Sequence, residues 1–168
     1  MIETKRLLLK PLTYDQLVKY LKADNSLENE LNLKDSTRTI SPELKEAIEQ
    51  TILPNVADTT KNYLFSTLWS LISKEENKMV GDICIIGEPN EAGAIEIGYG
   101  TYEEFQGKGF MTEGVSGIIQ WAGTQENVSS IVADTEKTNI ASFSILVKNG
   151  FSKIGETEEL FSWKLSLE

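Results

Sequence analysis

A short apolar segment, two glycines and a helical pattern follow one another in this chain, and their order constrains the fold most. The apolar segment, residues 94–101, reads as a strand, and Gly107 and Gly109 come after it. Glycines between a strand and a helix let the backbone approach a ligand closely, often a phosphate. Apolar residues then recur at helical spacing, at Met111, Val115, Ile118, Ile119 and Ala122. The order therefore predicts a strand, an anion-binding turn and an amphipathic helix.

Two familiar phosphate-binding motifs do not fit this turn. The Walker loop requires G-x-x-x-x-G-K-[ST], but Tyr102 stands at its first glycine and Gly109 at its hydroxyl position. The dinucleotide fingerprint requires a third glycine at the position of Thr112. The turn is therefore not explained by either motif.

The backbone amides of this turn still form a ring of N–H donors at the positive end of a helix. The ring begins at Gln106 and runs to Met111, and a pyrophosphate fits it. Lys108 would add a positive charge at the rim. The alternative is a tight turn in which Lys108 is merely solvated.

The remaining patterns predict one mixed α/β domain over residues 1–168. Thr13 is a candidate cap for a first helix, and residues 24–41 read as a loop. Pro54 is expected to end a second helix that begins after Ser41, and Gly150 to cap the last helix. The other strands are expected at residues 6–9, 65–73, 79–86, 131–133, 151–154 and 160–165.

The charge balance narrows the possible partners. The chain has 26 acidic and 16 basic residues, a net charge of −10, and no long basic cluster, which disfavours nucleic-acid binding. A cationic or amine-bearing partner suits this charge slightly better. No apolar run approaches the ~20 residues that cross a membrane, and no export signal is visible. We expect a cytoplasmic protein that does not bind membranes.

The residue types exclude several catalytic mechanisms. The chain has no histidine, which excludes Ser-His-Asp and Cys-His catalysis and histidine-ligated metal sites, and we expect no metal. The only cysteine, Cys84, lies in an apolar run and is expected to be a buried structural thiol. Trp69, Trp121 and Trp163 are expected in the core.

Four segments, in register, resemble one family. They are residues 3–9, residues 96–99, residues 106–113, and residues 139–142 with 148–151. In these segments the chain resembles the GNAT superfamily of N-acetyltransferases, in the branch of the RimJ/RimL ribosomal-protein alanine acetyltransferases. One departure is that the pattern Q/R-x-x-G-x-G/A ends at Met111.

The resemblance implies a fold and a donor. The fold would be a mostly antiparallel α/β (α+β) sheet of about seven strands with helices on both faces. The donor would be acetyl-CoA, with its pantetheine arm pairing with the backbone at Tyr99 and Thr101 like an added strand. Its pyrophosphate would lie on the amides of Gln106, Gly107, Lys108, Gly109, Phe110, Met111 and Thr112.

The resemblance also assigns catalytic roles. Glu96, flanked by Ile95 and Ile97, is a proposed base in RimJ/RimL-like relatives, and partial burial would raise its pKa. Solvent exposure on an alternating strand is the other reading of Glu96. The amide of Tyr99 would stabilise the oxyanion.

The last helix would supply the groups around the CoA sulfur. Asn139 would bind pantetheine and Ser142 would meet the sulfur, because no tyrosine follows Tyr102 to act as the acid. A hydrogen bond from Ser142 back to the preceding turn is the alternative.

These inferences predict an N-acetyltransferase that transfers an acetyl group directly within a ternary complex. The acceptor would be a protein N-terminus or a small-molecule amine, and the protein would be a monomer or a homodimer. The alternative is a non-catalytic acyl-CoA-binding domain, against which Glu96 and Ser142 both argue.

Overall fold

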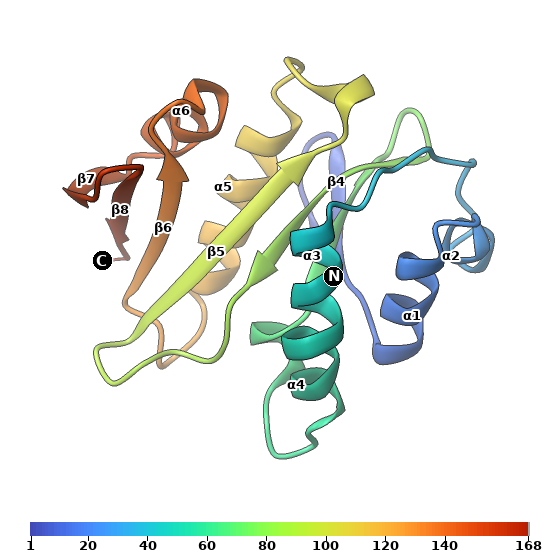
Figure 1. The fold of residues 1–168 in the computed structure, drawn as a ribbon, viewed down its shortest axis with the longest axis horizontal. Coiled ribbons are helices and arrows are strands. Elements are labelled where there is room, and N and C mark those ends of the chain that lie inside the picture. Colours follow the sequence, from blue (N-terminus) through green and yellow to red (C-terminus); the bar gives the residue numbers. More distant parts are fainter. Residues whose placement is uncertain (168) are drawn as a thin grey trace.

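Eight strands form one open sheet in the computed structural model, which describes residues 1–167 (Figure 1). Their order is β1-β2-β3-β4-β5-β6-β8-β7, and every neighbouring pair is antiparallel except β5 and β6. The strands are β1 (Ile2–Glu3), β2 (Leu7–Pro11), β3 (Leu68–Ser73), β4 (Lys78–Ile85), β5 (Ala94–Thr101), β6 (Ser130–Glu136), β7 (Ser152–Glu156) and β8 (Leu160–Ser166). The expected sheet is confirmed with one strand more, because the two-residue β1 adds to the edge.

Helices cover both faces of the sheet, as expected (Figure 1). Val115 and Ile118 of α5 and Leu146 of α6 pack on one face, whereas Leu17 of α1 and Ile48 pack on the other. The helices are α1 (Tyr14–Lys22), α2 (Ser26–Glu30), α3 (Pro42–Ala47), α4 (Leu53–Ala57), α5 (Phe110–Ala122) and α6 (Ile140–Lys148).

The helix that begins after Ser41 does not end at Pro54. Ser41 caps α3, a π-helical turn spans Ile48–Ile52, and α4 continues to Ala57. The amide of Leu53 bonds to the carbonyl of Ile48, five residues back, at the end of this wide turn. Pro54 then falls in the first turn of α4, where a missing N–H costs little. The predicted loop over residues 24–41 likewise contains the short helix α2.

A glycine in α5 lets this helix lie close to the sheet. A Cβ atom on Gly114 would come within 2.5 Å of the Leu71 side chain on β3, closer than real Cβ contacts. Close packing at Gly114 fixes the position of α5, and with it the loop that precedes the helix.

Strands β5 and β6 separate at the middle of the sheet. They pair in parallel only up to Glu96 and Val132, while β5 continues along β4 to Thr101 and β6 continues along β8 to Glu136. Figure 1 shows the two strands diverging, with α5 and α6 near the opening. The opening leaves one edge of β5 without a neighbouring strand.

Candidate active site

Strand β5 has two different faces and one unpaired edge. Ile95 and Ile97 are buried on the α5 face, so Glu96, Gly98 and Gly100 point to the opposite face. The carbonyl of Glu96 accepts from Ile86 on the β4 side at 2.8 Å, and the amide of Tyr102 donates to Val80 at 2.9 Å. Even-numbered residues thus pair with β4, and the amides of Tyr99 and Thr101 point toward the opening.

The glycine loop presents free amides at the start of α5. Gly107 and Gly109 have φ angles of 76° and 80°, which glycine adopts readily. The amide of Gln106 donates to the carbonyl of Glu103 at 3.3 Å, so the ring of free donors begins one residue later than expected. Within residues 1–167, the amides of residues 107–112 have no hydrogen-bond partner. A helix N-terminus with several free amides suits a pyrophosphate.

Arg6 holds this loop from the outside. Its Nη1 atom donates to the carbonyl of Lys108 at 2.9 Å, and its Nε atom donates to Glu113 at 2.7 Å. Burial disfavours the ionised form of Glu113, but hydrogen bonds from Thr4 and Arg6 outweigh burial and lower its pKa. The N-terminal segment thus fixes the loop through charged hydrogen bonds.

Met111 does not obstruct the loop. Its side chain is buried in the core on the α5 face, and its terminal methyl lies near Gly81. The departure from a glycine or alanine at this position is therefore accommodated inside the protein.

The first turn of α6 faces the opening between β5 and β6. Asn139 caps the helix through its Oδ1 atom, which accepts from the amide of Ser142 at 3.1 Å. The hydroxyl of Tyr99 donates to the carbonyl of Ser142 at 2.7 Å. The alternative for Ser142, a hydrogen bond from its hydroxyl back to the preceding turn, is not found within residues 1–167.

Most of the predicted site residues line one cavity of about 470 Å³. It extends from the glycine loop along β5 to the first turn of α6. The predicted residues in its lining are Tyr99, Thr101, Gln106, Gly107, Gly109, Phe110, Met111, Thr112, Asn139 and Ser142. Lys108 and Glu96 are not among the lining residues.

Glu96 lies on the opposite face of β5 from this cavity. Its side chain is exposed, and its pKa is raised by partial burial and by the nearby charge of Asp134. Gly98, the next residue on the same face, lines a second cavity. Glu96 is therefore on the face of β5 that borders that cavity, although it is not among the residues that line the cavity.

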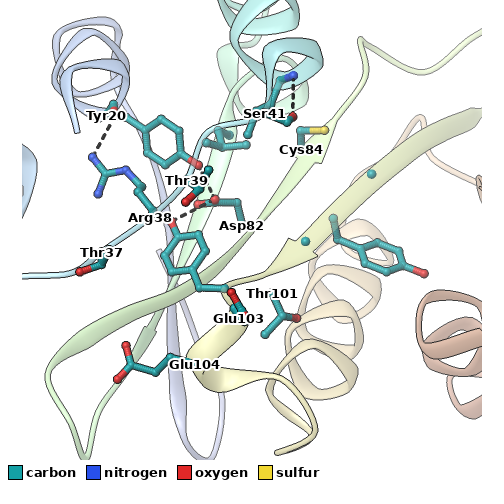
Figure 2. Close-up of a pocket in the computed structure, with 16 residues that line it drawn as sticks. Tyr20, Thr37, Arg38, Thr39, Ser41, Asp82, Cys84, Thr101, Glu103 and Glu104 are labelled. Carbon is teal, nitrogen blue, oxygen red and sulfur yellow. Dashed lines mark hydrogen bonds between the residues drawn. The ribbon is translucent and has the colours of Figure 1, made fainter. Parts of the chain in front are cut away.

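The second cavity, of about 850 Å³, was not predicted from the sequence. Its wall comes from α1, the segment before α3, β4 and the end of β5 (Figure 2). At its floor lies Asp82, 6% exposed, which accepts from the hydroxyls of Tyr20 at 2.6 Å, Tyr102 at 3.1 Å and Ser70 at 3.3 Å. Burial raises the pKa of Asp82 to about 6 although these bonds and the charge of Arg38 oppose it. The sequence offered one indication of this site, because Asp82 is the only charged residue in the apolar run 79–86.

Cys84 lines this second cavity as well. The residue as a whole is only partly buried, whereas its thiol group is surrounded by protein atoms. Burial of its side chain raises the pKa of the thiol to about 11, so the nucleophilic thiolate is scarce near pH 7.

The family comparison decides what this arrangement is. The family described as "Acetyltransferase (GNAT) domain" matches residues 6–152. The chain belongs to this family. It is therefore an acyltransferase that uses acetyl-CoA.

Similar proteins cover nearly the whole chain. The uncharacterized N-acetyltransferase YjdG from Bacillus subtilis (strain 168) is 30% identical over 166 residues, which are 97% of this chain and 96% of YjdG. The structure of RimL, a ribosomal L7/L12 protein acetyltransferase in complex with coenzyme A, has a TM-score of 0.69 at 15% identity over 98% of this chain and 96% of RimL. A chimera of the spermidine N-acetyltransferase SpeG from Vibrio cholerae has a TM-score of 0.67 at 16% identity, over 97% of this chain and 96% of the chimera.

None of the helices formed by residues 1–167 has the length and apolar character needed to cross a membrane. In the same part of the chain, no group of three or more His, Cys, Asp and Glu side chains could hold a metal ion.

Proposed function

We propose that this protein transfers an acetyl group from acetyl-CoA to a primary amine, directly and within a ternary complex. The observation that carries the proposal is that the two cavities meet at β5, since Tyr99, Gly100 and Thr101 line both. A donor bound on one side and an acceptor bound on the other would meet at this strand. We place the whole reaction in one domain over residues 1–168.

The residues of the smaller cavity fit acetyl-CoA. The free amides of residues 107–112 would hold the pyrophosphate, and a Cβ atom on Gly107 would meet nothing within 4 Å, so the loop is open. The amides of Tyr99 and Thr101 would pair with the pantetheine arm. The Nδ2 group of Asn139 stays available as a donor because its Oδ1 atom caps α6.

The transfer forms a bond between the amine nitrogen and the acetyl carbon and breaks the bond from that carbon to sulfur. The amine must first lose a proton, for which Glu96 is the candidate acceptor, acting through water because it does not itself line the cavity. The amide of Tyr99 would stabilise negative charge on the acetyl oxygen. The hydroxyl of Ser142 would meet the departing sulfur.

The acceptor is a primary amine on a protein N-terminus or on a small molecule. The similar structures include an acetyltransferase of a ribosomal protein and an acetyltransferase of spermidine, and both acceptors offer amines. We further propose a cytoplasmic protein, a monomer or a homodimer, that binds neither nucleic acid nor membranes. The net charge of −10 supports the proposal that it does not bind nucleic acid.

The release of free CoA thiol from acetyl-CoA over a panel of primary amines tests the proposal. We expect amine-dependent release that falls at least about 10-fold in Glu96→Gln and is unchanged in Glu91→Gln, an exposed loop residue. Tight CoA binding without release for any amine would instead identify a non-catalytic acyl-CoA-binding domain.

A further inference from the structure

The acceptor-side cavity has a buried carboxylate that no basic side chain neutralises. Among residues 1–167, no lysine, arginine or N-terminal nitrogen lies within 4 Å of Asp82. Its three hydrogen-bond donors are all neutral hydroxyls, from Tyr20, Tyr102 and Ser70. A buried acidic group that is held by neutral donors alone favours a positive ligand beside it.

Arg38 is the nearest cation, and its bonds are directed elsewhere. Its Nη1 atom donates to Glu28 at 2.6 Å and its Nη2 atom to the carbonyl of Tyr20 at 2.9 Å. Its guanidinium carbon lies 4.4 Å from the centre of the Tyr20 ring, and Figure 2 shows it on the far side of that ring from Asp82. Arg38 is thus paired with Glu28, and its charge acts on Asp82 only from a distance, without a direct contact.

The two tyrosines extend the site into the cavity. Burial raises the pKa of both hydroxyls, so each stays protonated and donates its hydrogen bond to Asp82. A tyrosine oxygen that donates to Asp82 can only accept from a ligand. Tyr20, Asp82 and Tyr102 together therefore offer acceptor atoms alone, which suits an ammonium group with its three N–H donors.

The approach to this site is open and acidic. Gly100 pairs with Asp82 across the two strands, and a Cβ atom on Gly100 would meet nothing within 4 Å. Glu103 and Glu104 also line the cavity, and Lys78 lies 3.8 Å from Glu104. A positively charged group can reach Asp82 over the bare backbone of β5.

A group bound at Asp82 is not the group that reacts. Asp82 lies on β4, whereas the amides of Tyr99 and Thr101 that face the donor lie on the far edge of β5. One strand spacing, about 4.8 Å, and the width of β5 separate the two places. An amine at the donor edge is therefore too far away to contact Asp82 itself.

We propose that Asp82, with Tyr20 and Tyr102, recognises a second positively charged group of the acceptor. The substrate class is a small aliphatic amine that carries another protonated nitrogen a few carbon atoms from the amine that reacts. This inference rests on the proposed function, because it takes the larger cavity as the acceptor site.

The test compares two acceptors of equal length that differ in one charge, 1,4-diaminobutane and n-butylamine. We expect kcat/KM for the diamine to exceed that for butylamine by about 10-fold or more, since a hydrogen bond between charged groups is stronger than one between neutral groups. In Asp82→Asn the ratio of the two values should fall close to one, mainly through KM for the diamine. Tyr102→Phe, which keeps the carboxylate, should lower the ratio less.

A binding measurement separates this inference from the proposed function. Calorimetric titration of the CoA-bound protein with 1,4-diaminobutane reports binding whether or not any amine is acetylated. Binding that is lost in Asp82→Asn, in a variant that still unfolds cooperatively, supports the inference. If Asp82→Asn does not fold, a smaller but measurable weakening of diamine binding in Tyr102→Phe supports it. A ratio of kcat/KM values near one in wild type, or a ratio that the folded variants leave unchanged, overturns it.

Discussion

The hydroxyl of Tyr99 on β5 donates a 2.7 Å hydrogen bond to the carbonyl oxygen of Ser142 in the first turn of α6. This bond crosses the opening that begins where β5 and β6 stop pairing at Glu96 and Val132. A side chain thus replaces the backbone ladder and holds the two walls of the donor cavity together.

Removing this bond should loosen the donor cavity. Tyr99→Phe deletes only the hydroxyl, so we expect a loss of about 1 kcal/mol in the free energy of unfolding. We also expect KM for acetyl-CoA to rise several-fold while the protein remains folded. Initial rates at varied acetyl-CoA, with denaturant unfolding in parallel, measure both. An unchanged KM would show that the bond does not set the cavity width.

The glycine loop should respond to a single methyl group. Gly107→Ala places a side chain at a φ of 76°, which should cost about 1–2 kcal/mol of stability and weaken CoA binding. Gly87→Ala is the matched control, because Gly87 has a φ of 91°, also meets nothing within 4 Å, and lines neither cavity. The two variants should lose similar amounts of unfolding free energy. Calorimetric titration with CoA should show weaker binding in Gly107→Ala alone. Equal CoA affinities would argue against a pyrophosphate on this loop.

The buried pair of Arg38 and Glu28 should be far more sensitive than a surface pair. Their side chains are 2% and 1% exposed, and Glu28→Ala leaves the guanidinium without its partner, at a cost of about 3–5 kcal/mol. Glu3→Ala, which removes the exposed partner of Lys74, should cost under about 1 kcal/mol. Urea unfolding measures both variants.

A double variant tests the reason for this sensitivity. Glu28 Oε1 and Arg38 Nε have no hydrogen-bond partner among the described residues, so the pair is incompletely satisfied. Glu28→Leu combined with Arg38→Met should therefore recover most of the loss. A double variant as unstable as Glu28→Ala would point to packing rather than to the unpaired charge.

The carboxyl group of Asp82 should make stability depend on pH. Burial raises its pKa from 3.8 to about 6, against the hydrogen bonds from Tyr20, Tyr102 and Ser70 and the charge of Arg38. Between these two pKa values the folded state binds more protons than the unfolded state, so stability falls as pH rises. At about 1.4 kcal/mol per pKa unit, the total loss is about 3 kcal/mol.

Asp82→Asn, the variant that tests recognition of the diamine, also tests this pH dependence. Asp82→Asn cannot titrate, so its stability relative to wild type should improve by up to about 3 kcal/mol between pH 4 and about pH 7. Unfolding by urea across this range measures the difference. A difference that stays constant with pH would mean that Asp82 has an ordinary pKa in the folded protein.

Local patterns in the sequence predicted most of the fold. Thr13 forms a capping box with Gln16 at the start of α1, and Gly150 has a φ of 88° after α6, because caps depend on a few neighbouring residues. The prediction that Pro54 ends the helix was wrong, since Pro54 falls in the first turn of α4, where a missing N–H costs little.

The acceptor cavity could not be predicted in this way. The surroundings of Asp82 come from α1, β3, β4 and residue 102, so its burial and its donors exist only after the chain has folded. The contact between Arg6 and the carbonyl of Lys108 joins residues 102 positions apart, and no local pattern indicates it. The donor loop carried a local signal, whereas the acceptor side depended on long-range packing.

Two-substrate kinetics tests the central claim, direct transfer across β5, most directly. Initial rates are measured with acetyl-CoA and an accepted amine both varied, and the mass of the intact protein is measured with acetyl-CoA alone. Direct transfer predicts double-reciprocal lines that intersect, and a protein mass that acetyl-CoA leaves unchanged. Parallel lines together with an acetylated protein that passes its acetyl group to the amine would contradict this account.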